Sequence, residues 1–576
     1  MAVLPPSQDT VELLPPLGPR RDLGRPAPFR VPGLTAASLL VAALFLVPIG
    51  SILASLLLPS QGTWQHLAET VLPGYIVNTL LLVLGVGVGV LLVGVSTAWL
   101  VTMCRFPGVR LFEWALILPL AVPAYVMAYS YTDFLQFAGP LQSSLRALMG
   151  WEAGDYWFPN VRSLEGAMLM LIMVLYPYVY LLTRAAFIEQ SVCILEVSRT
   201  LGCSTWRAFW QVALPTARPA IAAGTALALM ETLADYGTVS FFGLPTFTTG
   251  IIRAWIAFGD PIAAAQLSVA LLGFVLLVLL IERWSRGRAR FHQTSSRFQR
   301  LPSYRLRGWR AAGAILVCAL PLTLGFLLPA AILVDMAIQV GDEQFGARYL
   351  SLVGNSLTLA SVTAVLAVAI ATLLAYSRRL TPNLLNTAAN RIAALGYAIP
   401  GTVIAVGVLI PAALFDNTLD AWMRSTFGLS TGLLLTGTIA ALVFAYLVRF
   451  LAISLGTVEA SLAKVRPSMD DAARNLGLRP AGVLARIHVP MMRGSMLTAG
   501  LIVLVDVMKE LPATLVMRPF NFDTLAVQAY NLASDERLAE SSTASLTIVA
   551  VGVLPLILLS AAIRRSRPGH GGREAP

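Results

Sequence analysis

Long apolar segments alternate with short polar ones along the chain after residue 33. Each apolar segment is long enough to cross about 30 Å of hydrocarbon as a helix. Twelve spans are predicted, at 34–58, 76–102, 112–134, 164–186, 217–240, 263–282, 313–338, 352–376, 392–415, 432–455, 495–517 and 540–563. Prolines inside them are compatible with membrane helices whose neighbours satisfy the freed backbone groups. We therefore expect an all-α membrane protein.

Two polar stretches between spans are near-copies of each other. Residues 196–219 read EVSRTLGCSTWRAFWQVALPTARP, and residues 471–490 read DAARNLGLRPAGVLARIHVP. In each stretch a glycine follows the first acid by six positions, and a proline closes an apolar-x-apolar run. Four positions of the first stretch each lie 275 residues before their counterparts in the second, so the chain is two versions of one unit. The matched pairs are Glu196 and Asp471, Gly202 and Gly477, Val212 and Ile487, and Pro215 and Pro490.

Each unit contains six predicted spans. Because six is even, both units enter the membrane in the same direction, which predicts two tandem six-helix units related by a pseudo-two-fold axis along the membrane normal. The expected divisions are a cytoplasmic disordered tail at 1–33, a first unit at 34–282, a basic linker at 283–312, a second unit at 313–563 and a basic tail at 564–576.

Charge sets the orientation of the spans. Arginines crowd the 283–312 linker and follow the last span, so the positive-inside rule places both termini and the two repeated stretches in the cytoplasm. The 1–33 tail has no apolar core of the kind that a secretory signal needs. A net charge of +11 therefore needs no nucleic acid as partner, and lipid headgroups are the expected contact.

Other chemistry is sparse. Hydrophobic residues make up 57% of the chain and charged ones 12%, and the four cysteines and four histidines show no disulfide or metal-ligand spacing. The chain contains no G-x-x-x-x-G-K-[ST] phosphate-binding loop, so we do not expect it to hydrolyse ATP. We expect no catalytic residues, no metal site and no bound cofactor.

The repeated stretches are predicted to fold as two short helices each. Gly202 and Gly477 suit the left-handed turn that ends a helix. In the first copy Phe209 lies on the apolar face of the next helix, which Pro215 is expected to stop; in the second copy Ser468 and Asp471 suggest a capping box. An amphipathic loop on the membrane surface is the alternative, and the matched duplication disfavours it.

In both stretches an acid is followed six positions later by a glycine, and nine residues separate this glycine from an apolar-x-apolar-Pro sequence. This pattern looks like the EAA loop of bacterial ABC importer permeases. The resemblance implies an inner-membrane location, two cytoplasmic ATPase subunits that bind ATP and Mg²⁺, and an extracytoplasmic substrate-binding protein. It also implies that the two stretches, called the first and second coupling segments below, dock into the ATPases. The residues that carry this role by resemblance are Glu196, Gly202, Phe209, Pro215, Asp471, Ala472, Ala473, Gly477, Leu484 and Pro490.

A narrower resemblance concerns the cargo. The runs METLADYGT from Met230 and KELPAT from Lys509, with RPFNFDTLA from Arg518, resemble the ferric iron permeases in which two units are fused. Permeases for thiamine, polyamines, sulfate or phosphonates share the architecture and stay open as alternatives. An ion-gradient-driven secondary transporter is the rival of a different class, although it has no ATPase to dock, and a membrane enzyme would need chemistry that the sequence does not show.

Ionisable residues recur inside the spans that follow the coupling segments. Glu231 and Asp235 lie 275 positions before Asp506 and Glu510, and Lys509 stands between the latter two. Charges inside a membrane are costly and tend to face a bundle interior or a watery cavity. We hypothesise that these five residues line or gate a translocation pathway; the alternative is a structural ion pair that fixes helix packing.

Overall fold

The structure, a computed structural model, describes residues 32–59, 63–152, 154–189, 207, 209–286, 304–340 and 346–565. Of the predicted features, Glu196, Gly202, most of the N-terminal tail and most of the linker lie outside these ranges. Within them the regular secondary structure is helical apart from two paired two-residue strands, β1 (Cys104–Arg105) and β2 (Tyr304–Arg305). The all-α prediction is confirmed.

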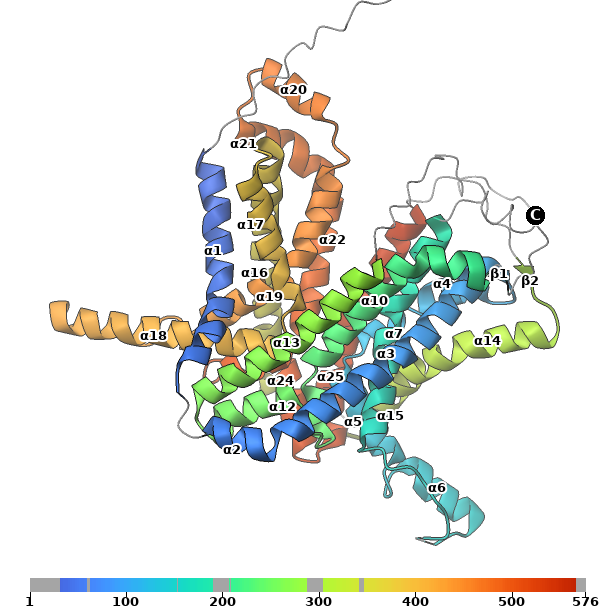
Figure 1. Cartoon of the computed structure of the whole chain (residues 1–576). Coiled ribbons are helices and arrows are strands. Elements are labelled where there is room, and N and C mark those ends of the chain that lie inside the picture. Colours follow the sequence, from blue (N-terminus) through green and yellow to red (C-terminus); the bar gives the residue numbers. More distant parts are fainter. Residues whose placement is uncertain are drawn as a thin grey trace, which may run out of the picture.

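The helices fall into two series along the chain (Figure 1). The first series is α1 (Pro32–Ala54), η1 (Ser55–Leu57), α2 (Thr63–Thr70), α3 (Leu72–Met103), α4 (Val109–Ala115), η2 (Leu118–Ala121), α5 (Ala124–Leu135), α6 (Pro140–Met149), α7 (Leu164–Glu189), η3 (Phe209–Ala213), α10 (Leu214–Ala234), α11 (Gly237–Phe241), α12 (Phe247–Ile252), η4 (Arg253–Ala257) and α13 (Pro261–Arg286).

The second series repeats this order. It comprises α14 (Trp309–Leu322), η5 (Thr323–Leu327), α15 (Leu328–Val340), α16 (Ala347–Leu380), α17 (Leu384–Ala394), η7 (Leu395–Ala398), α18 (Gly401–Phe427), α19 (Ile439–Leu462), α20 (Pro467–Asn475), α21 (Pro480–Val483), η8 (Leu484–His488), α22 (Val489–Met508), α23 (Pro512–Met517), α24 (Leu525–Ser534) and α25 (Leu538–Arg565). The starts of α3 and α16, of α7 and α19, and of η3 and η8 are each 275 positions apart, as the sequence repeat predicts.

Eleven helices in the described part of the chain are long and apolar enough to cross a membrane. The number becomes twelve when the pair 109–121 and 124–149, bent by 91°, counts as one span. This agrees with the twelve predicted spans.

Three helices form the centre of each unit. In the first unit α3, α7 and α10 pack together, and α16, α19 and α22 do so in the second. Small residues let the backbones approach closely. At Gly224 of α10 an added Cβ would lie 2.8 Å from the Cα of Val179 in α7, so this crossing has no room for a larger side chain.

The first helix of each unit packs against the other unit. Helix α1 contacts α17 and α18, where a Cβ on Gly407 would meet the carbonyl of Pro48 at 2.6 Å. Reciprocally, η5 contacts η2 and α7, and the Tyr131 hydroxyl of α5 donates to the Leu324 carbonyl at 2.6 Å. The two units are therefore interlocked, and each is covered partly by a helix that belongs to the other in sequence.

Four predicted spans are interrupted rather than continuous. Extended residues Val122 and Ile399 precede Pro123 and Pro400 and separate η2 from α5 and η7 from α18. The residue before a proline avoids the helical region, so these prolines break their spans. The spans predicted at 217–240 and 495–517 stop at α10 and α22 and resume as the short helices α11 and α23.

Candidate functional site

The interruptions converge on a cavity between the two units. It has a volume of about 120 Å³ and is lined by residues of both halves. Non-helical backbone at membrane depth occurs where it is buried in protein or lines a cavity, which fits this position. The lining residues at the interruptions are Val122, Pro123, Asp235, Tyr236, Tyr397, Lys509, Glu510 and Leu511.

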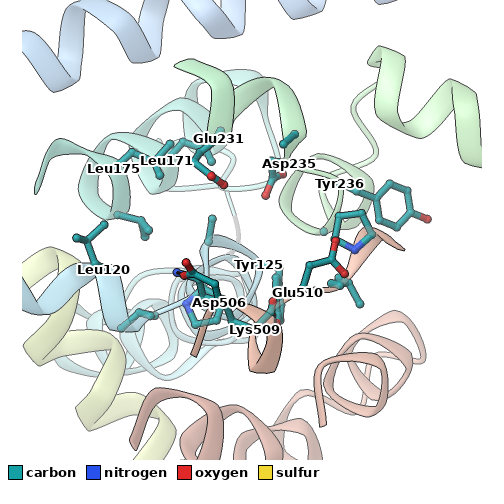
Figure 2. Close-up of a pocket in the computed structure, with 18 of the residues that line it drawn as sticks. Leu120, Tyr125, Leu171, Leu175, Glu231, Asp235, Tyr236, Asp506, Lys509 and Glu510 are labelled. Carbon is teal, nitrogen blue, oxygen red and sulfur yellow. Dashed lines mark hydrogen bonds and ion pairs between the residues drawn. The ribbon is translucent and has the colours of Figure 1, made fainter. Parts of the chain in front are cut away.

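All five residues hypothesised as a pathway or gate line this one cavity. In Figure 2, Glu231 and Asp235 lie on one side, and Asp506, Lys509 and Glu510 lie on the other. The Lys509 ammonium is 2.8 Å from the Asp506 carboxylate, a pair within one helix turn. This distance fits the alternative that the pair fixes packing, whereas Glu231 is 28% exposed and faces the open space.

Asp235 and Glu510 each start a short helix. The Asp235 carboxylate accepts from the backbone N–H groups of Thr238 and Val239, both at 3.1 Å. The Glu510 carboxylate accepts from those of Ala513 and Thr514 at 3.0 and 3.2 Å. A carboxylate at a helix start satisfies donors that have no partner within the helix. These two acids therefore have a structural role at the cavity wall.

The sequence reasoning missed one cation of this cavity. Arg449 lies midway along α19, is 8% exposed and lines the cavity between Glu231 and Glu510. Its guanidinium nitrogens are 3.7 Å from a carboxylate oxygen of each. The signal was present, because an arginine interrupts an otherwise apolar predicted span, and such a residue is a functional candidate by position alone.

The second coupling segment forms two helices at one end of the second unit (Figure 1). Helix α20 ends at Asn475, and Gly477 follows with φ of +79°, the left-handed turn that the sequence predicts. The predicted capping box is wrong: Arg466 is the N-cap without a side-chain bond, and Asp471 pairs with Arg474 at 3.5 Å. Pro467 occupies the first helical turn, where its missing N–H has no cost.

The helix after the turn continues into the span. Residues 480–488 are helical and pass through the π-helical turn η8 into α22, so Pro490 does not end the helix. In the first unit the π-helical turn η3 likewise joins α10, and the expectation that Pro215 stops the helix is wrong. A proline has no N–H to donate to the backbone hydrogen bonds of a helix. The π turn before it changes the hydrogen-bonding pattern there, so the helix continues without that bond.

A polar cluster ties the second coupling segment to the span beneath it. Arg379 of α16 donates to Asp470 at 2.8 Å and to two main-chain carbonyls, one at the last residue of α19 and one in the loop that follows. The buried His488 ring lies 2.9 Å from the other Asp470 oxygen, and the Tyr376 hydroxyl donates to the Pro480 carbonyl at 2.7 Å. These contacts connect α16 to the starts of α20 and α21, and they connect α20 to η8.

The first coupling segment is described from residue 209 on, with Arg207. Phe209 packs against Trp99 of α3 with ring centroids 4.8 Å apart, and is 9% exposed. Trp99 also meets Phe187 of α7 edge to face. Phe209 is therefore a packing residue of its own unit, whereas the adjacent Trp210 is 51% exposed. Pro215 is exposed.

The predicted docking residues of the second segment divide by exposure. Ala472, Gly477 and Pro490 are exposed, Asp471 and Leu484 are half-buried, and Ala473 is buried. Leu476, which the sequence reasoning did not select, is 82% exposed at the turn. Among the described residues no group of three or more His, Cys, Asp or Glu side chains could hold a metal ion.

The chain is similar in sequence to known transport proteins. Residues 91–290 match the family model described as "Binding-protein-dependent transport system inner membrane component". The chain is 30% identical over 206 residues to the "Molybdenum transport system permease protein ModB" of Escherichia coli (strain K12), which covers 34% of this chain and 87% of that protein.

Two further similarities extend the comparison. The chain is 25% identical over 489 residues to the "Fe(3+)-transport system permease protein FbpB 2" of Haemophilus influenzae, a match over 84% of this chain and 88% of that protein. It is 29% identical over 211 residues to the "Putative 2-aminoethylphosphonate transport system permease protein PhnU" of Salmonella choleraesuis, over 36% and 73% respectively. All three relatives are transport permeases rather than enzymes.

Proposed function

The chain belongs to the family of inner membrane components of binding-protein-dependent transport systems, and we propose that the cargo it passes is ferric iron. It is the permease of an ABC importer and a multi-pass inner-membrane protein. The observation that supports the cargo is the extent of similarity: the iron permease matches across both units, whereas the molybdenum and phosphonate permeases match about a third of the chain.

The charge of the cavity also favours a cation. Four carboxylates and two basic side chains face it. Molybdate and phosphonates are anions, and an excess of negative charge on a cavity wall repels them. An oxyanion importer is the second candidate, supported by the two relatives with that cargo in their names.

The family implies a separate ATPase and a binding protein outside the membrane. We propose two ATPase copies per chain, one at each coupling segment, with both termini in the cytoplasm. ATP and Mg²⁺ would be held by those subunits. ATP binding would draw the two coupling segments together and turn the cavity outward, where the binding protein delivers cargo. Hydrolysis would restore the first conformation.

Uptake of radiolabelled Fe(III) by cells that carry this chain and its ATPase tests the proposal. We expect Gly477→Val to abolish uptake and to lower ATPase co-purification, because a β-branched residue does not adopt φ of +79° and the second coupling segment would lose its turn. Gly494→Ala is the matched control, since this helical glycine has open space around it. Iron uptake that stays at background while wild type binds the ATPase would refute the cargo; molybdate uptake would then favour the second candidate.

A further inference from the structure

Arg449 connects the two units at the cavity wall. It lies on α19 of the second unit, 3.7 Å from Glu231 on α10 of the first unit and 3.7 Å from Glu510 in its own unit. Its side chain is 9% exposed and that of Glu510 is 3% exposed. In so little water the attraction between opposite charges is strong, and a buried charge that loses its partner is costly.

The two carboxylates hold Arg449 in different ways. Glu510 is fixed, because its oxygens also accept from the first backbone N–H groups of α23. Glu231 is 28% exposed and belongs to the opposite unit. Relative movement of the units would therefore separate Arg449 from Glu231 and leave its pair with Glu510 intact.

The repeat shows that the second unit is built to hold this arginine. At the position 275 residues earlier the first unit has Val174, which lines the same cavity. Helix α18 begins with Gly401, where an added Cβ would overlap the guanidinium of Arg449 and come within 2.5 Å of Glu510. Helix α5 begins with Ala124 instead, and the acid of the first unit is the shorter Asp235. The second unit therefore combines the space at Gly401, the cation Arg449 and the longer acid Glu510, and the first unit has none of these three at the matching positions.

We propose that Arg449 is a positioning residue that acts as a charge latch between the units. Its pair with Glu231 holds α10 and α19 together in the conformation seen here, and opening of the cavity breaks that pair. The latch raises the barrier to opening in the absence of binding protein, and so suppresses idle ATP hydrolysis. This inference rests on the proposed function, since it needs a chain coupled to an ATPase.

The test is a double-mutant cycle on idle hydrolysis, measured in proteoliposomes with the chain and its ATPase but no binding protein. We expect Arg449→Met and Glu231→Gln each to raise the idle rate about fivefold. The double variant should be no faster than the faster single variant, because the pair between Arg449 and Glu231 is the one interaction that opening breaks, and each change alone already removes it. Arg449→Lys keeps the charge and should restore most of the suppression, which a purely steric role would not permit.

Glu536→Gln supplies the matched comparison. It breaks the pair with Arg162, at 2.8 Å, which also joins the two units but does not line this cavity, so its effect should multiply with that of Arg449→Met. If Arg449→Met fails to insert, Glu231→Gln carries the test, because this more exposed acid does not start a helix. An unchanged idle rate in Glu231→Gln, or single effects that multiply in the double variant, overturns the latch. If wild type binds no ATPase, the proposed function falls instead.

Discussion

The two halves hold their coupling segments by different chemistry. In the second unit a buried polar cluster of Arg379, Asp470 and His488 ties the segment to α16. In the first unit, within the described residues, aromatic packing of Trp99 against Phe209 connects η3 to α3. The repeat is thus one of backbone plan, and each copy reached a separate solution for the contacts beneath it.

Positions 275 apart show how complete this difference is. The first unit has Cys104 and Ala213 where the second has Arg379 and His488. The second has Leu374 and Leu484 where the first has Trp99 and Phe209. A polar cluster needs every partner, because a half-satisfied buried network is costly, whereas apolar contacts lose energy gradually. The second segment should therefore be the more sensitive to single changes.

Arg379→Met should have the largest effect on stability. It leaves Asp470 without its main cation and removes two bonds to main-chain carbonyls. Breaking one partner of a buried pair costs about 3–5 kcal/mol. Thermal unfolding in detergent should show a clear fall in Tm, and Cys104→Ala at the matching position of the first unit should cost less. Equal losses at the two sites would contradict the asymmetry.

Trp99→Leu gives the first unit the residue that the second has at that position. The ring contacts with Phe209 and Phe187 are lost, while apolar volume is partly kept. We expect a loss of about 1–2 kcal/mol, from the aromatic pairs and the smaller side chain. The measurement is again thermal unfolding, with Leu374→Ile as the control in the second unit. A loss as large as that of Arg379→Met would show that aromatic packing is not the weaker tie.

Glu536→Gln should have the smallest effect. Arg162 and Glu536 join the two units by two hydrogen bonds of 2.8 Å, and this bonding lowers the pKa of Glu536 below its ordinary value of 4.5. Because the pKa is lower in the folded protein, the pair stabilises the fold at neutral pH. This stabilisation is lost as the pH falls below about 4.5 and the carboxylate becomes protonated. Because the glutamate side chain is 59% exposed, the contribution is at most about 1 kcal/mol. The difference in Tm between wild type and variant should shrink from pH 7 to pH 4; a difference that grows would contradict the pairing.

The repeat, the spans and the acids of the cavity could be predicted from the sequence because they depend on spacing and hydrophobicity alone. The spacing of 275 recurs in the helix starts, and Glu231 and Asp506 face one space. The interruptions at Pro123 and Pro400 could not be predicted from the sequence. A proline in a membrane helix is compatible with a kink or a break, and packing against neighbouring helices decides between the two.

Other features depended on contacts that a single chain pattern does not contain. Phe209 fits the apolar face of a helix, but whether that face meets a partner or α3 depends on the position of Trp99, 110 residues earlier. The exchange of the first helices between units is likewise a matter of tertiary packing. Arg449 was visible as a charge in an apolar span, but its two carboxylate partners come from separate parts of the chain.

The central claim is that one chain carries two docking places for an ATPase. Native mass spectrometry of the complex, purified through a tag on this chain, counts the ATPase copies directly. The account predicts two copies per chain, and one copy when Gly477→Val disables the second coupling segment alone. A wild-type complex with no ATPase, or with a single copy that Gly477→Val leaves in place, would contradict it.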